Sequence, residues 1–280
     1  MVKKNSITVL PAPESPSEAI SAATLILVRE KNGGMETYLM RRRSRKGAFA
    51  GAFVFPGGVV EPSDSDPGLL ARTRKPRGSN DFDSALFMAA IRETFEESGV
   101  LFADCWNDGA FLHRADVARG RMSFPDLAGA YDLCIRADEL APFGRWVTPL
   151  SEPRRFDARF FAARMPKGQE PVPDGDELVE GLWISPAEAL SRQAEGGLPL
   201  FPPTLCTLWE IGQSPSFESL AEKAAGNDLG PVLPQPFYTG DSMGVLLPHD
   251  PEYGIDGFRQ KARPGKPSRV VARRGVWELL

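Results

Sequence analysis

One segment of this chain, residues 84–98 (SALFMAAIRETFEES), constrains its fold and chemistry more than any other. At about 100° per residue, a helix places Glu93, Glu96 and Glu97 on one face. The large apolar side chains lie on the opposite face: Phe87, Ile91 and Phe95. That face should pack on a sheet, and Gly99 is typical of a helix end. The segment therefore predicts an amphipathic helix whose carboxylates form the wall of a cleft.

The position of these carboxylates is unfavourable for a purely structural helix. Like charges three and four residues apart repel by roughly 0.2–0.5 kcal/mol per pair. Glu96 and Glu97 also lie in the last turn, where the helix dipole disfavours anions. A bound divalent cation removes both costs, and clustered carboxylate oxygens suit Mg²⁺ or Mn²⁺. The alternative for an isolated cluster of this kind is a Glu-rich, solvated helix end.

Charge and composition argue against several other classes of protein. The net charge is -4 and the pI about 5.4, whereas proteins that grip nucleic acid are usually basic or carry a large basic face. The scattered Cys105, Cys134 and Cys206 form neither a disulfide framework nor a CxxC zinc pair. His113 and His249 are too few for a histidine-based metal site or triad. We therefore expect a small-molecule substrate and no nucleic-acid partner.

No segment has the pattern typical of a membrane span, and the start of the sequence does not have the pattern typical of a signal peptide. Its longest apolar run, residues 22–28, is far shorter than the ~20 residues that a spanning helix needs. The start of the chain has two lysines but no apolar stretch before its proline and glutamate residues. We therefore expect a cytoplasmic protein with no membrane partner.

Strand and helix patterns alternate along the chain, which predicts an α/β or α+β fold with a mixed sheet. The patterns predict strands at residues 24–29, 37–42, 53–55, 100–103, 145–148, 156–162, 177–184 and 244–247. They predict helices at residues 84–98, 185–195, 203–212 and 217–225, with helical pieces within 115–141.

We expect three parts in the chain. Residues 1–18 are polar and Pro-rich and predict a flexible arm, and residues 19–229 form the main domain. Residues 230–280 form a Pro-rich extension that packs on the same domain. Within the domain, the prolines and glycines of residues 61–83 predict a loop, most of it an insertion over about residues 65–83.

The acidic helix is part of a longer motif. Residues 92–100 read RETFEESGV, and residues 55–58 read FPGG at the end of a strand. This pattern resembles the Nudix box, G-x5-E-x7-R-E-U-x-E-E-x-G-U, in which U is aliphatic; Thr94 stands at the first U and Asp64 at the first E. Residues 65–91 number 27 where the family has 7, an insertion of 20 that costs little closure entropy.

An insertion inside the box makes the chain similar to the long Nudix proteins related to the peroxisomal coenzyme A diphosphatases. Further stretches support the resemblance, which covers roughly residues 20–195: residues 47–58, 146–161 and 177–190. It implies an α/β/α sandwich that hydrolyses CoA or acyl-CoA to adenosine 3′,5′-bisphosphate and (acyl-)4′-phosphopantetheine. One coenzyme A signature is only partly present, because Gly47 stands at its arginine position, although Arg42 matches an earlier arginine.

The resemblance also implies the catalytic roles. Glu93, Glu96 and Glu97, with the backbone carbonyl of Gly57, would bind Mg²⁺ or Mn²⁺, which lowers the pKa of an attacking water. Arg92 would orient the glutamates through salt bridges.

Residues outside the motif are less constrained. Glu177, in an acidic turn, is a candidate general base, and an ordinary turn before a strand is the alternative. We expect substrate contacts from four residues: Arg42, Gly58, Arg154 and Arg155. Arginines suit phosphate groups. The alternatives are a solvated strand end for Arg42 and a structural ion pair with Asp157 or another acidic residue for the Arg154–Arg155 pair.

Other functions remain open at this point. A Nudix box determines the reaction, hydrolysis of a diphosphate linkage, but it does not determine the leaving group. ADP-ribose, NADH and dinucleoside polyphosphates are therefore alternative substrates. A non-catalytic nucleotide sensor and an RNA-decapping enzyme are further alternatives. The three intact glutamates argue against the sensor, and the acidic composition argues against decapping. A homodimer is also open.

Overall fold

The computed structural model describes residues 7–31, 33–43, 51–76, 83–104, 108–226 and 230–280. The central strands are β2 (Ala19–Lys31), β3 (Gly34–Arg42), β4 (Phe53–Val54), β5 (Gly57–Val59), β9 (Ala141–Val147), β10 (Arg155–Arg164) and β11 (Leu178–Ile184). They form a mixed seven-stranded sheet in the order β11-β3-β2-β10-β9, with β4 paired to β3 and β5 to β2. Six of the predicted strands overlap these elements.

Two pairings define the centre of the sheet. β2 and β3 form an antiparallel hairpin with Val28 opposite Thr37, and the left-handed Gly33 (φ 77°) closes its turn. β10 lies parallel to β2 along its full length, with Phe160 opposite Thr24. Because side chains of β2 are buried in runs rather than in alternation, both faces of the sheet require a cover.

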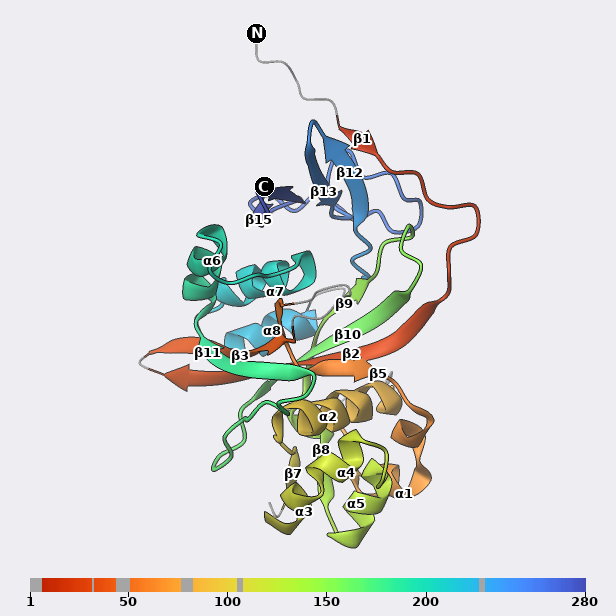
Figure 1. Cartoon of the computed structure of the whole chain (residues 1–280), viewed down its shortest axis with the longest axis vertical. Coiled ribbons are helices and arrows are strands. Elements are labelled where there is room, and N and C mark those ends of the chain that lie inside the picture. The colour runs from red at the N-terminus through yellow and green to blue at the C-terminus, as the bar shows by residue number, and fades with distance from the viewer. Residues whose placement is uncertain (1–6, 32, 44–50, 77–82, 105–107, 227–229) are drawn as a thin grey trace.

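Helices provide that cover on both faces (Figure 1). The helices of one face are α6 (Pro186–Ala194), α7 (Pro202–Gly212) and α8 (Phe217–Gly226). The other face carries α2 (Ser84–Ser98) and the shorter helices around it. The chain therefore has the predicted α/β/α arrangement. Ser185 caps α6 by accepting a hydrogen bond from the amide of Glu188, as its Ser-Pro start predicts.

Helix α2 has the predicted limits, and Gly99 ends it in the left-handed conformation (φ 74°). Phe87 packs on the sheet, with its ring centroid 4.4 Å from that of Phe161 on β10. The ring centroid of Phe95 lies 6.2 Å from that of Phe124 of α5 (Phe124–Ala130), because α2 is covered on its outer side as well.

The outer cover of α2 is a small subdomain that the sequence did not predict as such. Its helices are α1 (Pro67–Ala71), α3 (Asp108–Leu112), α4 (Arg114–Ala118) and α5, with short 3-10 turns at Pro62–Ser65 and Ala137–Glu139. Its strands β6 (Thr73–Arg74), β7 (Ala103–Asp104) and β8 (Cys134–Arg136) form a three-stranded sheet in the order β6-β8-β7. The expected loop over residues 61–83 is thus largely ordered structure, although residues 77–82 lie outside the described residues.

The predicted strand at residues 100–103 is largely absent, since only Ala103 belongs to β7. Val100, Leu101 and Phe102 are buried, which explains the apolar pattern. The amide side chain of Gln169 accepts from the N–H of Leu101 at 2.8 Å and donates to its carbonyl oxygen at 2.8 Å. These two bonds replace those that a neighbouring strand would have made.

The C-terminal extension forms a sheet of its own, where the sequence predicted a single strand. Its strands are β12 (Gln235–Thr239), β13 (Ser242–Leu246), β14 (Arg269–Arg273) and β15 (Val276–Leu279). The order is β1-β12-β13-β14-β15, and β1 (Thr8–Val9) comes from the start of the chain. One face of this sheet packs on α6 and α7 through Val245, Leu247 and Val270.

Part of the expected flexible arm, residues 1–18, is therefore held in a sheet, because Thr8 and Val9 pair with Tyr238 and Phe237. Residues 1–6 lie outside the described residues. Among the described helices, none is both long enough and apolar enough to cross a membrane.

Candidate active site

Helix α2 meets the sheet at the start of β5, and two glycines make that approach possible. A Cβ atom on Gly57 would lie 2.4 Å from the carbonyl oxygen of Ala23. A Cβ atom on Gly58 would lie 2.4 Å from a carboxylate oxygen of Glu93. The N–H of Gly57 donates to the carboxylate of Glu97 at 2.8 Å. The FPGG segment therefore lets acidic side chains of α2 lie directly against backbone.

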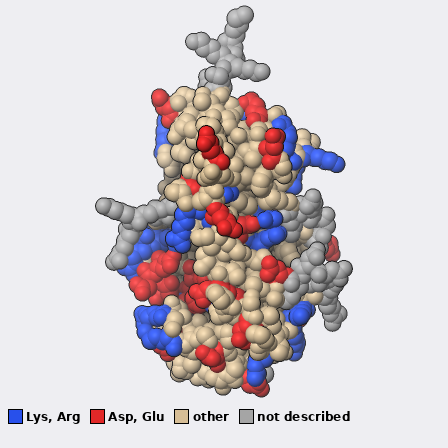
Figure 2. Space-filling model, turned by 90° about the vertical axis from the view of Figure 1, so that its right-hand side faces the viewer, with Lys and Arg blue, Asp and Glu red and all other residues tan. Residues whose placement is uncertain are grey.

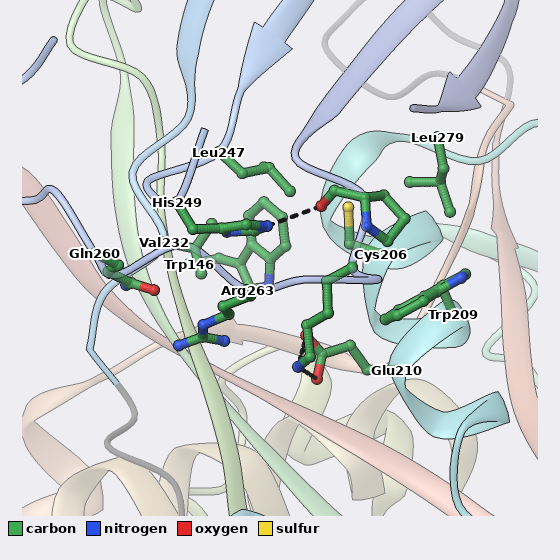
Figure 3. Close-up of a pocket in the computed structure, with 12 residues that line it drawn as sticks. Trp146, Cys206, Trp209, Glu210, Val232, Leu247, His249, Gln260, Arg263 and Leu279 are labelled. Atoms are coloured by element: carbon green, nitrogen blue, oxygen red, sulfur yellow. Dashed lines mark hydrogen bonds and ion pairs between the residues drawn. The ribbon is translucent and has the colours of Figure 1, made fainter. Parts of the chain in front are cut away.

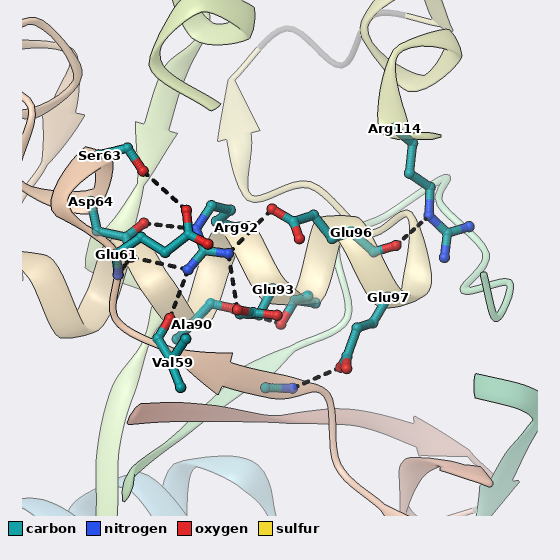
Figure 4. A network of polar contacts seen from close by, with 12 residues as sticks. Val59, Glu61, Ser63, Asp64, Ala90, Arg92, Glu93, Glu96, Glu97 and Arg114 are labelled. Atoms are coloured by element: carbon teal, nitrogen blue, oxygen red, sulfur yellow. Dashed lines mark hydrogen bonds and ion pairs between the residues drawn. The ribbon is translucent and has the colours of Figure 1, made fainter. Parts of the chain in front are cut away.

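Arg92 joins the two halves of the motif (Figure 4). Its buried guanidinium donates to both carboxylate oxygens of Asp64, at 2.9 and 3.1 Å, and to the carbonyl oxygen of Val59 at 2.8 Å. It also donates to Glu93 at 2.9 Å and Glu96 at 3.2 Å. Asp64 thus lies beside the helix in space, as its position in the motif predicts, even though a 27-residue segment separates it from Arg92.

Burial shifts the ionisation of the three glutamates. Burial raises the pKa of Glu93 to about 7, with Arg92 opposing the shift and Glu96 adding to it. Burial also raises the pKa of Glu96, again against the pull of Arg92. For Glu97, burial and the charge of Glu93 raise the pKa well above the usual range, and the N–H of Gly57 opposes them. Burial, more than repulsion between the carboxylates, therefore disfavours the charged form of these side chains in the metal-free site.

This donor set fits a divalent cation. Hard carboxylate oxygens on one helix face are the ligands that Mg²⁺ and Mn²⁺ prefer, and a cation would stabilise the charged form that burial disfavours. Within the described ranges, no three carboxylate, histidine or cysteine side chains yet converge on one point. Glu93 and Glu96 instead bind Arg92, and Glu97 binds the N–H of Gly57.

The structure brings Glu177 to the same region from the start of β11. Arg42, at the end of β3, forms an ion pair with Glu177. The charge of Glu177 contributes to the raised pKa of Glu97, and the charge of Arg42 opposes it. Both residues selected from the sequence therefore act electrostatically on the acidic helix, although 135 residues separate them from each other along the chain.

The turn before Glu177 is held by its own hydrogen bonds. A carboxylate oxygen of Asp174 accepts from the N–H groups of Asp176, Glu177 and Leu178 at 2.5, 2.9 and 3.1 Å. Arg43 donates to the carbonyl oxygen of Asp176 at 2.6 Å. The segment is thus an ordered acidic turn that presents Glu177 from a defined position.

The Arg154–Arg155 pair does not act as a unit. Arg155 is buried and donates to the carbonyl oxygens of Thr148 at 3.1 Å and Ser17 at 2.6 Å. The structure therefore gives Arg155 a structural role in place of the expected substrate contact. Arg154 is exposed, and its Cζ atom lies 5.1 Å from the ring centroid of Phe156. The expected ion pair with Asp157 is formed by Arg145 instead, at 2.5 Å.

Sequence reasoning missed Arg114, which comes from α4 in the small subdomain. Its Nε–H donates to the carbonyl oxygen of Glu96 at 2.9 Å, at the end of α2 (Figure 4). One of its terminal nitrogens, Nη2, is buried without a hydrogen-bond partner among the residues that the structure describes. No signal in the sequence identifies Arg114, because it lies outside the motif in a segment whose position only the fold decides.

The surface at the level of α2 is strongly charged. Figure 2 shows acidic side chains gathered at this height, with basic side chains above and below them. The expected arginine position of the coenzyme A signature, residue 47, lies outside the described residues.

A separate pocket lies on the opposite face of the sheet, between α7 and the C-terminal extension (Figure 3). His249 bonds there to the carbonyl oxygen of Pro267 at 3.0 Å, and burial lowers its pKa. Burial raises the pKa of the Cys206 thiol. Both groups are therefore held in their neutral forms, and we assign no chemistry to them.

Comparisons with known proteins agree with this geometry. The family described as the NUDT19 Nudix domain matches residues 66–211, slightly more than half of the chain. Putative nudix hydrolase 7 of Caenorhabditis elegans is 32% identical over 228 residues, which cover 78% of this chain and 68% of the relative. The acyl-coenzyme A diphosphatases NUDT19 of Gallus gallus and Homo sapiens are 28% and 26% identical, each over 79% of this chain and over 73% and 72% of their own lengths.

A solved structure shows the same fold. The crystal structure of a NUDIX hydrolase from Alicyclobacillus acidocaldarius is 30% identical and superposes with a TM-score of 0.63, covering 77% of this chain and 99% of that chain. The motif, the helix that carries it and these relatives lead to one conclusion: the chain belongs to the Nudix hydrolases, in the NUDT19 branch, and is an enzyme that hydrolyses phosphoanhydride bonds.

Proposed function

We propose that the protein hydrolyses the diphosphate linkage of CoA or acyl-CoA to adenosine 3′,5′-bisphosphate and (acyl-)4′-phosphopantetheine. The relatives named acyl-coenzyme A diphosphatase support this substrate. The observation that carries the chemistry is the acidic face of α2, buried against Gly57 and Gly58 and organised by Arg92.

Nudix hydrolases generally use divalent metals, and we propose Mg²⁺ or Mn²⁺ here. Glu93, Glu96 and Glu97, with the carbonyl oxygen of Gly57, would hold it. A bound cation would neutralise diphosphate charge and lower the pKa of an attacking water.

The protein residues then have separate tasks. Arg92 fixes the orientation of Glu93 and Glu96 through its hydrogen bonds. Glu177 accepts a proton from the attacking water, because its charge already acts on Glu97 and its turn is ordered. Water adds to one phosphorus, the bond from that phosphorus to the bridging oxygen breaks, and the second phosphoryl group leaves with that oxygen.

Two arginines are suited to bind the substrate. Arg42 faces the acidic site through Glu177, and a diphosphate that displaced Glu177 would gain a charge-assisted hydrogen bond and free the base. Arg154 is exposed and is suited to a peripheral phosphate. Gly58 allows close approach of backbone to the site because it has no side chain.

A substrate panel with matched variants tests this proposal. The panel contains CoA, an acyl-CoA, ADP-ribose, NADH and a diadenosine polyphosphate, each with Mg²⁺ or Mn²⁺. Glu97→Gln keeps an acceptor for the N–H of Gly57 but removes a charge, and Glu222→Gln makes the same change on the exposed side of α8. We expect hydrolysis of CoA or acyl-CoA by the wild type and by Glu222→Gln, and a loss of at least about 100-fold in Glu97→Gln.

Each outcome has a defined meaning. Preferred cleavage of another panel member would overturn the CoA assignment and keep the Nudix chemistry. A Glu97→Gln variant with nearly normal activity would overturn the metal assignment.

A further inference from the structure

Four chain segments meet at the end of the catalytic helix: the last turn of α2, the start of α4, the middle of β3, and the loop of residues 165–177 that leads into β11. The loop carries the acidic turn that ends at Glu177. The N–H of Val172 donates to the carbonyl oxygen of Ser98 at 2.8 Å. The hydroxyl of Tyr38 donates to the carbonyl oxygen of Pro171 at 3.2 Å. The loop is therefore attached both to the helix and to the sheet.

The Tyr38 hydroxyl reaches this place only because β11 has a glycine there. A Cβ atom on Gly181 would lie 1.8 Å from the hydroxyl oxygen of Tyr38 and 3.1 Å from a ring carbon of Pro173. The packing of β3 against β11 thus leaves a slot for the tyrosine, and the loop closes over it.

Arg114 lies at the same junction and comes from the subdomain that covers α2. Its Nε–H binds the carbonyl oxygen of Glu96, one of the carbonyl groups at a helix end that lack a partner within the helix. A Cβ atom on Gly99 would lie 3.4 Å from Nη1 of Arg114, so the guanidinium lies against the end of α2. Burial lowers the pKa of Arg114, and the carboxylates of Asp174 and Glu97 oppose that shift.

The unpaired nitrogen of Arg114 is the unusual feature. A buried N–H group without an acceptor costs free energy, so a residue that only capped the helix would not need it. The nearby carboxylates of Asp174 and Glu97 supply a reason for a cation here, since each lies on a different segment of the site.

We propose that Arg114 is a positioning residue that holds the last turn of α2 through its hydrogen bond to the carbonyl oxygen of Glu96, and thereby holds the loop of residues 171–177, which is attached to the same turn at Ser98. It acts through other groups and does not touch the reacting atoms. This inference rests on the proposed function only for its effect on the rate, because the positioning itself is a property of the folded chain.

Hydrogen–deuterium exchange of the full-length protein tests the positioning directly. Arg114→Gln removes the charge, and Arg121→Gln is the matched control, since Arg121 follows α4, is exposed and pairs with Asp116. We expect amide exchange in residues 96–101 and 171–178 to rise at least about fivefold in Arg114→Gln and to stay unchanged in Arg121→Gln. Equal exchange in the two variants, or a rise confined to residues 96–101, would overturn the proposal.

Kinetics provide the second measurement. We expect kcat of Arg114→Gln to fall about tenfold with a much smaller change in substrate KM, because a displaced loop misaligns the site. Arg114→Lys keeps the charge, and we expect it to recover most of the exchange protection and of kcat. If Arg114→Gln fails to fold, the lysine variant decides the question: without such recovery the charge has no positioning role. If the wild type cleaves no panel substrate, the proposed function fails and the exchange result alone decides this inference.

Discussion

Helices α2 and α7 pack on opposite faces of one sheet and differ in the charged side chains that they bury. Buried residues of α7 are apolar or neutral, and its single charged residue, Glu210, is partly exposed and pairs with Lys266 at 3.1 Å. Helix α2 instead buries Arg92 and leaves the side chains of Glu93 and Glu96 only 14% and 15% exposed. Burying a charged group costs free energy unless the group is paired. Helix α7 therefore stabilises the fold, whereas the charged groups of α2 organise a reactive site at a cost in stability.

The largest expected effect breaks the charge network of α2. Arg92→Leu leaves Asp64 buried without its partner and removes the donor that orients Glu93 and Glu96. We expect a loss of about 3–5 kcal/mol in the free energy of unfolding, together with loss of activity. Urea unfolding measures the first quantity. A stable Arg92→Leu protein would show that Asp64 finds another donor.

A matched change on α7 should separate stability from activity. Leu208 is fully buried there, and Leu208→Ala should cost about 2–5 kcal/mol by leaving a cavity. The protein that remains folded should keep its kcat, because α7 carries no group of the site. A large fall in kcat per folded molecule would mean that the two faces are coupled through the sheet.

A single methyl group added beside α2, in Gly58→Ala, should destabilise the fold less than Arg92→Leu or Leu208→Ala does, and it should clearly lower activity. Gly58→Ala would push Glu93 from its place, since the new Cβ would lie 2.4 Å from the carboxylate. We expect activity to fall roughly 100-fold. In contrast, Gly129→Ala on α5 meets no atom within 4 Å and should stabilise the protein by about 0.4–1 kcal/mol. Unchanged activity in Gly58→Ala would show that Glu93 can shift freely.

The smallest effect concerns pH. The pKa of Glu93 is raised from 4.5 to about 7 in the folded chain, so the folded state binds more protons than the unfolded state between these values. The metal-free protein should therefore lose a few degrees of Tm as pH rises from 4.5 through about 7. Stabilisation by added Mg²⁺ should grow over the same range, because the ion competes with protons. Thermal unfolding with EDTA or Mg²⁺ measures both trends, and a Mg²⁺ effect independent of pH would contradict them.

The sequence by itself determined α2 and its motif. Helix limits follow from periodicity and from Gly99, and the carboxylate face follows from residue spacing, which are properties of neighbouring residues. The motif also connected FPGG and Asp64 to Arg92 across a long insertion, because the family pattern carries that long-range information.

Only the tertiary structure decided the remaining parts. Contacts such as Arg42 with Glu177, or Tyr38 with Pro171, join residues that are 135 and 133 positions apart, and no local pattern encodes such a pairing. The same reason applies to the strands of the subdomain and of the C-terminal sheet, which are short and form through distant partners. Arg155 and Arg114 show the consequence. The sequence selected Arg155, which is buried and donates to the carbonyl oxygen of Thr148, and it gave no signal for Arg114, which binds the end of α2.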